Sequence, residues 1–104
     1  MIRTYTLHTR RKGEDELLVL LRTDELPEGD RKTAEIPGSY NLDPGTYGSS
    51  ALARAIVADA LDREIADRFW KEFERNFLTE TTVQSFRVTS HDILHWIHSQ
   101  EVVP

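Results

Sequence analysis

The stretch that decides the fold is GTYGSSALARAIVADAL, residues 45 to 61. A glycine-rich turn, Gly45 to Ser50, opens onto an apolar segment that runs from Ala51 to Leu61. On a helical wheel the apolar positions of this segment surround the axis and are interrupted only by Arg54 and Asp59, which is the pattern of a helix buried on most sides. The sequence therefore predicts a central, buried helix over residues 51 to 61, around which the other elements pack.

The length of 104 residues predicts a single small α+β domain that spans residues 1 to 104. The chain contains no cysteine, which excludes a disulfide scaffold and a thiolate nucleophile or metal ligand, so we expect a cytoplasmic protein. No apolar signal segment follows Met1, and the longest aliphatic run, Leu17 to Leu21, is too short to cross a bilayer. We therefore expect neither export nor contact with a membrane.

The formal net charge is -5, which argues against broad binding to nucleic acid because such binding depends on a basic surface. The basic residues 10 to 12 are followed at once by the acidic residues 14 to 16, so the two groups cancel locally. The charge favours a protein as the partner.

The N-terminal part predicts a β-hairpin. Residues 3 to 9 alternate around Tyr5 and Leu7, residues 10 to 15 form a charged turn, and residues 16 to 22 form a second aliphatic strand. Residues 23 to 46 are mostly polar and are broken by proline and glycine. We expect a long irregular connection there, with at most a short strand at Thr33 to Ile36.

The C-terminal part predicts a helix, a strand and a final helix. The first helix, about Arg63 to Leu78, is amphipathic, and the strand covers Thr82 to Val88. Thr89 is the expected N-cap of the last helix, with Asp92 returning to the backbone. The residues expected to face the core are Ile65, Ala66, Phe69, Trp70, Phe73 and Phe77 in the first helix and Ile93, Leu94, Trp96 and Ile97 in the second.

Three motifs in this chain resemble a known family. They are GxxGxxxLAxAIxAD at residues 45 to 59, FxK at residues 69 to 71, and FxVTxxDIxxWI at residues 86 to 97. Together they resemble a family of short uncharacterised domains, a domain of unknown function found in bacteria, archaea, plasmids and phages. The resemblance covers roughly residues 42 to 98. It implies a fold and a phage or mobile-element context, and it implies no established activity.

The turn from Gly45 to Ser50 has two interpretations. The free N–H groups of a helix start can hold a phosphate or a carboxylate. Alternatively, Gly48 or Ser49 simply caps the helix. We favour the capping role, because the Gly-Lys-Ser/Thr ending of a Walker motif is absent.

The histidines His91, His95 and His98 share the side of the last helix opposite its apolar residues. His91 and His98 lie about 10 Å apart along a helix axis, too far for one ion at about 2.1 Å from each. His91 and His95 have the spacing of a zincin pair, but Asp92 follows the first histidine and is expected to cap the helix. Solvent-facing positions are the favoured interpretation, ahead of a pH-sensitive contact surface or a metal site at His91 and His95.

The sequence does not predict an enzyme or a cofactor. A set of Ser49 or Ser50 with His95 and Asp59 has no support from spacing, and no nucleophile elbow or dinucleotide fingerprint is present.

The leading hypothesis is a non-catalytic interaction module of a phage or mobile element that binds a host or defence-system protein, as a monomer or homodimer. Its candidate interaction residues are Tyr40, Tyr47, Gly48, Ser49, His91, His95 and His98. The alternative is a small metal- or phosphate-binding protein that uses the histidines or the Gly45 to Ser50 turn.

Overall fold

The computed structural model describes residues 2–11, 13, 17–26 and 33–101. Its strands form one antiparallel sheet in the order β3-β2-β1-β4. The strands are β1 (Ile2–Arg11), β2 (Leu17–Leu26), β3 (Thr33–Tyr40) and β4 (Arg87–Thr89). The α+β fold that the sequence predicts is confirmed.

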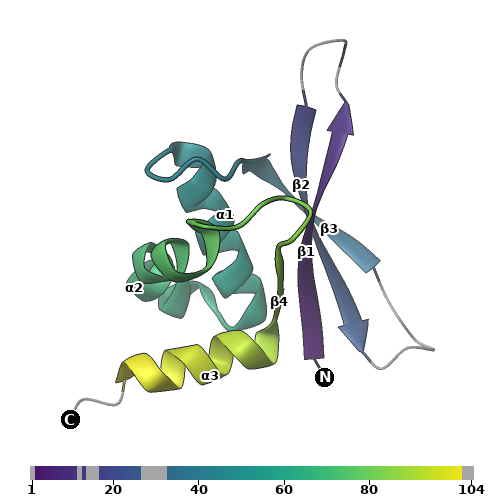
Figure 1. Cartoon of the computed structure of the whole chain (residues 1–104). Coiled ribbons are helices and arrows are strands. Elements are labelled where there is room, and N and C mark those ends of the chain that lie inside the picture. Colours follow the sequence, from purple (N-terminus) through teal and green to yellow (C-terminus); the bar gives the residue numbers. More distant parts are fainter. Residues whose placement is uncertain (1, 12, 14–16, 27–32, 102–104) are drawn as a thin grey trace.

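The helices lie together on one side of the sheet (Figure 1). They are α1 (Tyr47–Ala60), α2 (Arg63–Phe73), the π-helix η1 (Glu74–Leu78) and α3 (Ser90–Glu101). None of the helices in the described ranges is long and apolar enough to cross a membrane.

The hydrophobic core fills the space between the helices and the inner face of the sheet. In the strand register Tyr5 lies opposite Val88, and Leu7 lies opposite Leu21, so these side chains point to the same face. All four are buried and belong to one core cluster with residues of α1, α2 and α3.

The central helix of the prediction is confirmed in position. Leu52, Ala53, Ile56 and Val57 have no exposed surface, and Arg54 is exposed on the outer side of the helix. The helix begins earlier than expected, at Tyr47, and its N-cap is Thr46, whose side chain accepts a hydrogen bond from the Ser49 N–H at 3.3 Å.

The prediction that Gly48 or Ser49 caps α1 is therefore wrong. The start of the helix was inferred from apolar periodicity. Tyr47 is exposed and Gly48 has no side chain, so the first turn of α1 does not show this periodicity. The threonine that caps is a preferred N-cap residue.

The long irregular connection predicted at residues 23 to 46 is shorter than expected. Strand β2 continues to Leu26, and β3 runs from Thr33 to Tyr40 at the edge of the sheet. Proline at position 37 is compatible with an edge strand, because one side of such a strand forms no hydrogen bonds to a neighbouring strand and the absent N–H is not needed there. The strand is irregular there, because the register shifts between Val19 and Leu21.

The helix predicted over residues 63 to 78 changes its winding at Phe73. The segment Glu74–Leu78 is a π-helix, in which residues five apart in sequence are hydrogen-bonded neighbours. This winding buries both Phe73 and Leu78. An α-helical period over the whole segment does not place Leu78 among the residues that face the core, so its burial was not predicted.

The strand predicted at Thr82 to Val88 forms only at its end, as β4. Ser85 donates its backbone N–H to both the carbonyl and the hydroxyl oxygen of Thr82, at 3.2 and 3.1 Å. These local bonds make a turn and compete with extended structure. The alternation of apolar residues could not reveal that competition.

The start of α3 follows the prediction. The Asp92 N–H donates to the Thr89 hydroxyl at 3.0 Å, and the Thr89 N–H donates to the Asp92 carboxylate at 3.1 Å. This hydrogen bond from the Thr89 backbone lowers the pKa of the Asp92 carboxyl below its usual value. Ile93 and Ile97 are buried as expected, but Leu94 is 40% exposed, so its predicted place in the core is wrong.

A polar cluster ties α1 to the sheet. The Tyr5 hydroxyl donates to the Asp59 carboxylate at 2.7 Å, and Arg3 donates to the same oxygen at 2.9 Å. Burial, together with the hydrogen bond to Asp59, raises the pKa of Tyr5. The cluster fixes the C-terminal half of α1 against β1.

Candidate functional site

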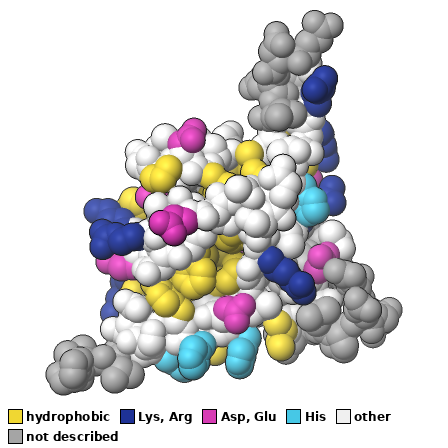
Figure 2. All heavy atoms as spheres, in the orientation of Figure 1, with side chains coloured by type: hydrophobic (Ala, Val, Ile, Leu, Met, Phe, Trp, Pro, Cys, Tyr) yellow, Lys and Arg dark blue, Asp and Glu magenta, His cyan; other side chains and the backbone are white. Residues whose placement is uncertain are grey.

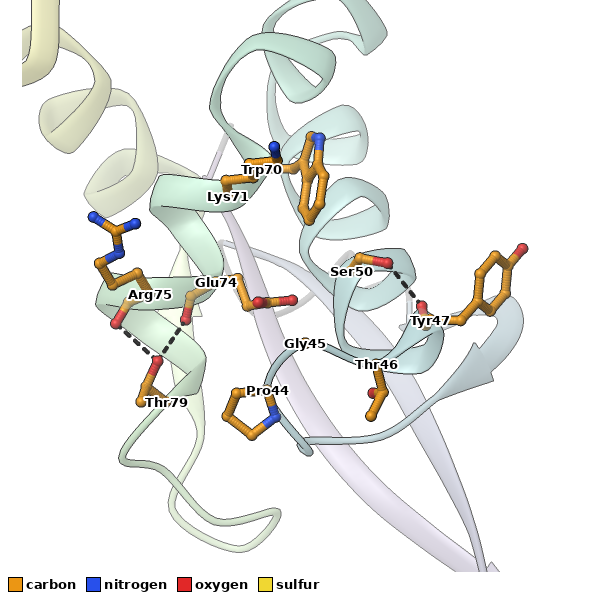
Figure 3. Close-up of a pocket in the computed structure, with 10 residues that line it drawn as sticks. All are labelled: Pro44, Gly45, Thr46, Tyr47, Ser50, Trp70, Lys71, Glu74, Arg75 and Thr79. Atoms are coloured by element: carbon orange, nitrogen blue, oxygen red, sulfur yellow. Dashed lines mark hydrogen bonds between the residues drawn. The ribbon is translucent and has the colours of Figure 1, made fainter.

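The candidate site is a hollow of about 470 Å³ between the start of α1 and the segment formed by α2 and η1 (Figure 3). One wall is the turn from Pro44 to Tyr47 together with Ser50. The other wall consists of Trp70, Lys71, Glu74, Arg75 and Thr79. The glycine-rich turn is therefore one side of a surface whose other side comes from a distant part of the sequence.

The turn is held in place by a close approach and by short hydrogen bonds. Gly45 has φ +80, which favours glycine. A Cβ atom at Gly48 would lie 2.4 Å from the Asn41 side-chain nitrogen, so only glycine allows this contact. The Asn41 side-chain oxygen accepts hydrogen bonds from the Thr46 hydroxyl at 2.7 Å and from the Asp43 N–H at 3.0 Å. These contacts hold the first turn of α1 against Asn41.

Glu74 places a carboxylate at this first turn. Its side chain accepts a hydrogen bond from the buried Ser49 hydroxyl at 2.9 Å, and Figure 3 shows it extending from η1 toward α1. A negative charge at a helix start is stabilised by the helix dipole. The Glu74 carboxylate thus already lies at the start of α1, where an external anion would bind.

Trp70 forms the aromatic part of the other wall. The Arg54 guanidinium lies 4.7 Å from the centroid of its ring and the Lys71 ammonium 5.6 Å, both within cation–π distance. Arg54 also pairs with Asp67 at 3.5 Å. Trp70 is half-buried, so part of the residue remains accessible to solvent.

Tyr47 stands at the rim of this hollow. Its side chain is 83% exposed, the highest value among the large hydrophobic residues that the structure describes. Tyr47 also lines a neighbouring hollow of about 460 Å³ that includes Tyr40 and Gly48. A single exposed aromatic ring thus borders both depressions.

Tyr40 is held more tightly than Tyr47. Its hydroxyl donates to the Pro37 carbonyl oxygen at 2.7 Å, and its ring lies so close to Gly38 that a Cβ there would be 2.3 Å from the ring. Burial raises the pKa of the Tyr40 hydroxyl. Tyr40 therefore shapes the floor of the neighbouring hollow.

The structure brings one group of the candidate interaction residues together and separates the other. Tyr40, Tyr47, Gly48 and Ser49 gather around the start of α1, where Gly48 and Ser49 are buried. His91, His95 and His98 are exposed on α3, and Figure 2 shows histidine side chains along the lower edge of the molecule. The interaction residues thus form two separate surfaces.

His91 and His95 are the candidate metal ligands on α3. Among the described residues, no group of three or more His, Asp or Glu side chains is arranged to hold a metal ion. A metal ion at His91 and His95 would therefore have no third protein ligand from the described part of the chain.

The serine, histidine and aspartate that the sequence analysis considered for catalysis belong to different networks. The Ser49 hydroxyl donates to Glu74, and the Ser50 hydroxyl donates to the Tyr47 carbonyl oxygen at 3.0 Å. Asp59 accepts from Tyr5 and Arg3. His95 is exposed on α3. No hydrogen bond links any two of them in the part of the chain that the structure describes.

Sequence reasoning missed Trp70, Lys71 and Arg75 as site residues. It placed Trp70 on the core face of a helix and the two cations on the opposite, solvated face. Only the packing of α2 and η1 against α1 shows that all three border one hollow with Tyr47. The one signal in the sequence was a large aromatic residue followed directly by a cation.

One comparison with known proteins finds a relationship. A family model described as a family of unknown function, DUF6166, matches residues 27–99. The match covers most of the chain and indicates no catalytic family, and it confirms the resemblance to a short uncharacterised domain. No curated protein and no solved structure matches the chain.

Proposed function

The chain belongs to the DUF6166 family of unknown function, and we propose that it is a non-catalytic protein-interaction module. In this proposal it is a cytoplasmic protein of a phage or mobile element, and it binds and modulates a host or defence-system protein. The mobile-element context rests on the sequence resemblance. The binding surface is the region around Tyr47.

The observation that carries the proposal is the position of Tyr47. A tyrosine that is 83% exposed loses apolar contact with water only when a partner covers it. Tyrosine and tryptophan are enriched among the residues that dominate binding energy, and they act best beside a pocket from which water is excluded. Tyr47 and Trp70 border the same hollow, so they supply such a pair.

The contacts that hold the turn add to this support. Thr46, Asn41 and Gly48 fix the first turn of α1 by hydrogen bonds and a close approach. A surface that is already ordered loses less conformational entropy when a partner binds. The separation of Ser49, Asp59 and His95 into different networks favours binding over catalysis.

The test is affinity capture from bacterial lysates with the wild-type protein, Tyr47→Ala and Leu94→Ala. Leu94 is the matched control, because it is an exposed apolar residue on α3, outside the hollow. We expect a reproducible protein partner with the wild type and the Leu94 variant, and its loss with the Tyr47 variant. Repeated capture of no specific protein, or equal capture by all three proteins, would contradict the proposal.

Phosphate binding at the Gly45 to Ser50 turn is the second candidate. It is favoured by Lys71, which lines the hollow at the start of α1. It is opposed by Glu74, whose carboxylate bonds to Ser49 there and would repel a phosphate. Thermal unfolding with and without inorganic phosphate distinguishes the candidates, and the same assay with zinc or nickel tests His91 and His95. A clear stabilisation by either ligand would favour this second candidate.

A further inference from the structure

We propose that the hollow beside Tyr47 takes an acidic segment of the partner protein. An apolar side chain of that segment sits in the hollow against Trp70, with Tyr47 at the rim, and its flanking carboxylates lie against Lys71 and Arg75. This inference rests on the proposed function and specifies the chemistry of the partner at the same surface.

The apolar part of the inference follows from the shape and lining of the hollow. Its volume of about 470 Å³ falls within the range of pockets that bury a small ligand, and it accommodates a bulky side chain. Trp70 stands on one wall of the hollow, and Pro44 and Gly45 lie on the other (Figure 3). The Tyr47 ring extends outward from the rim at the start of α1. An aromatic or aliphatic anchor would lose its contact with water there.

The acidic part follows from the cations on the rim. Lys71 and Arg75 are exposed, and within the described ranges neither forms an ion pair. Figure 3 shows Lys71 beside Trp70, whereas Arg75 projects from the outer side of η1, away from α1. A segment that lies in the hollow therefore meets Lys71 and reaches Arg75 only where it leaves the hollow over η1. In Figure 2, Lys and Arg side chains gather over α2 at the left of the view.

Two other charged side chains near the hollow have partners within the protein. Arg54 pairs with Asp67 at 3.5 Å, and the Glu74 carboxylate accepts from Ser49 at 2.9 Å on the side of α1. Lys71 and Arg75 are the cations of the lining that form no ion pair among the described residues, while the Glu74 carboxylate keeps its charge and disfavours an acidic group placed directly beside it. In a chain with a net charge of -5, such a local positive rim selects for a short acidic segment.

A polypeptide fits this surface better than a nucleic acid. Binding to a nucleic acid depends on many phosphate contacts over an extended basic surface. The overall negative charge of this chain repels a long polyanion, whereas a short acidic segment meets mainly the local field of the rim.

The experiment selects random displayed peptides on the immobilised full chain and then measures the enriched peptides by fluorescence anisotropy. The test variant is Lys71→Glu with Arg75→Glu. The matched control is Arg63→Glu with Arg87→Glu, two exposed arginines outside the hollow, which changes the net charge equally. Circular dichroism and melting curves verify that each variant is folded.

We expect enriched peptides that combine aspartate or glutamate with a bulky apolar residue. The Lys71 and Arg75 reversal should weaken their binding about tenfold or more, and the control should weaken it much less. If the reversal disturbs η1, the pair Lys71→Gln with Arg75→Gln replaces it and should still weaken binding more than Arg63→Gln with Arg87→Gln.

Several outcomes would overturn the inference. They are enrichment of basic, proline-rich or uncharged peptides, enrichment of none, equal effects of the test and control variants, and tighter binding of a single-stranded oligonucleotide than of any peptide. A lysate partner that depends on Tyr47 but not on Lys71 and Arg75 would leave the proposed function intact while this inference fails. A lysate that yields no partner would count against the proposed function itself.

Discussion

At the scale of single residues, Tyr5 links the sheet to the central helix. Its ring is fully buried, and its hydroxyl donates to the Asp59 carboxylate at 2.7 Å. Tyr5→Phe removes this donor and keeps the ring, so it should lower the free energy of unfolding by about 1 kcal/mol. Urea unfolding measures the difference.

The matched control for Tyr5 is Tyr40→Phe. It removes a hydroxyl that bonds to the Pro37 carbonyl oxygen in a more exposed setting. Its effect should stay within about 0.5 kcal/mol. An equal decrease in the free energy of unfolding of the two variants would show that the hydrogen bond to Asp59 stabilises the fold no more than the hydrogen bond to Pro37 does.

The same hydroxyl predicts a pH dependence. Burial and the hydrogen bond to Asp59 raise the pKa of Tyr5 in the folded protein. The unfolded chain therefore releases this proton first, at about pH 10. The resulting stability is fully present below about pH 10 and is lost as the pH rises toward the folded pKa.

Unfolding of the wild type and Tyr5→Phe across this pH range isolates the effect. The wild type should lose stability more steeply above about pH 10 than the variant does. Identical slopes would mean that the hydroxyl ionises as freely in the folded state as in the unfolded state.

The site could be predicted from the sequence only in part at this scale. Tyr47 was identifiable as an aromatic residue in a glycine-rich turn. Trp70 and Lys71 were not identifiable, because a helical wheel assigns them to opposite faces of one helix. Their common role arises from a contact between α1 and α2, and that contact connects segments far apart in the sequence.

At the scale of elements, the start of α3 offers a direct test. Thr89 and Asp92 exchange hydrogen bonds between side chain and backbone at 3.0 and 3.1 Å. Thr89→Ala removes the capping hydroxyl and should cost about 1 kcal/mol. The melting temperature measures this, with Ser99→Ala as the control, because Ser99 donates only to the Trp96 carbonyl oxygen late in α3. A control that loses as much stability as Thr89→Ala would contradict the capping role.

The elements differ in how well the sequence predicts them. Helix α1 and the capping of α3 are governed by local signals, namely apolar spacing and a threonine with an aspartate three residues later. Strand β3 depends on pairing with β2, so Pro37 and Gly38 read as chain breakers although they lie in an edge strand. The turn at Thr82 and Ser85 was missed for the opposite reason, because apolar alternation conceals side-chain bonds to the backbone.

At the scale of the whole molecule, α1 is enclosed between the sheet and the other helices. Its residues Leu52, Ala53, Ile56 and Val57 have no exposed surface, whereas β3 lies at the edge of the sheet with mostly exposed side chains. Amides in the most enclosed elements exchange only through large openings of the structure. We therefore expect the slowest amide hydrogen exchange in α1 and clearly faster exchange in β3. Exchange in α1 as fast as in β3 would contradict the central position of α1.

Within the whole molecule, the proposed binding surface lies at one end of the central helix, and the opposite end is held by the sheet. The sheet and the Arg3, Tyr5 and Asp59 cluster hold the C-terminal half of α1. The opposite end of the helix carries Tyr47 and the hollow beside Trp70. In the proposed function, a partner would therefore bind at the start of α1, at the end of the helix opposite the Arg3, Tyr5 and Asp59 cluster.

The most direct measurement replaces Tyr47 with a benzophenone-bearing phenylalanine analogue and irradiates the full chain in lysate, with the same analogue at Leu94 as the control. We expect the analogue at position 47 to form a covalent adduct with the protein that the wild type captures, and the analogue at position 94 to form far less of this adduct. An adduct that forms mainly at position 94, or equally at both positions, would contradict the claim that the surface around Tyr47 binds the partner.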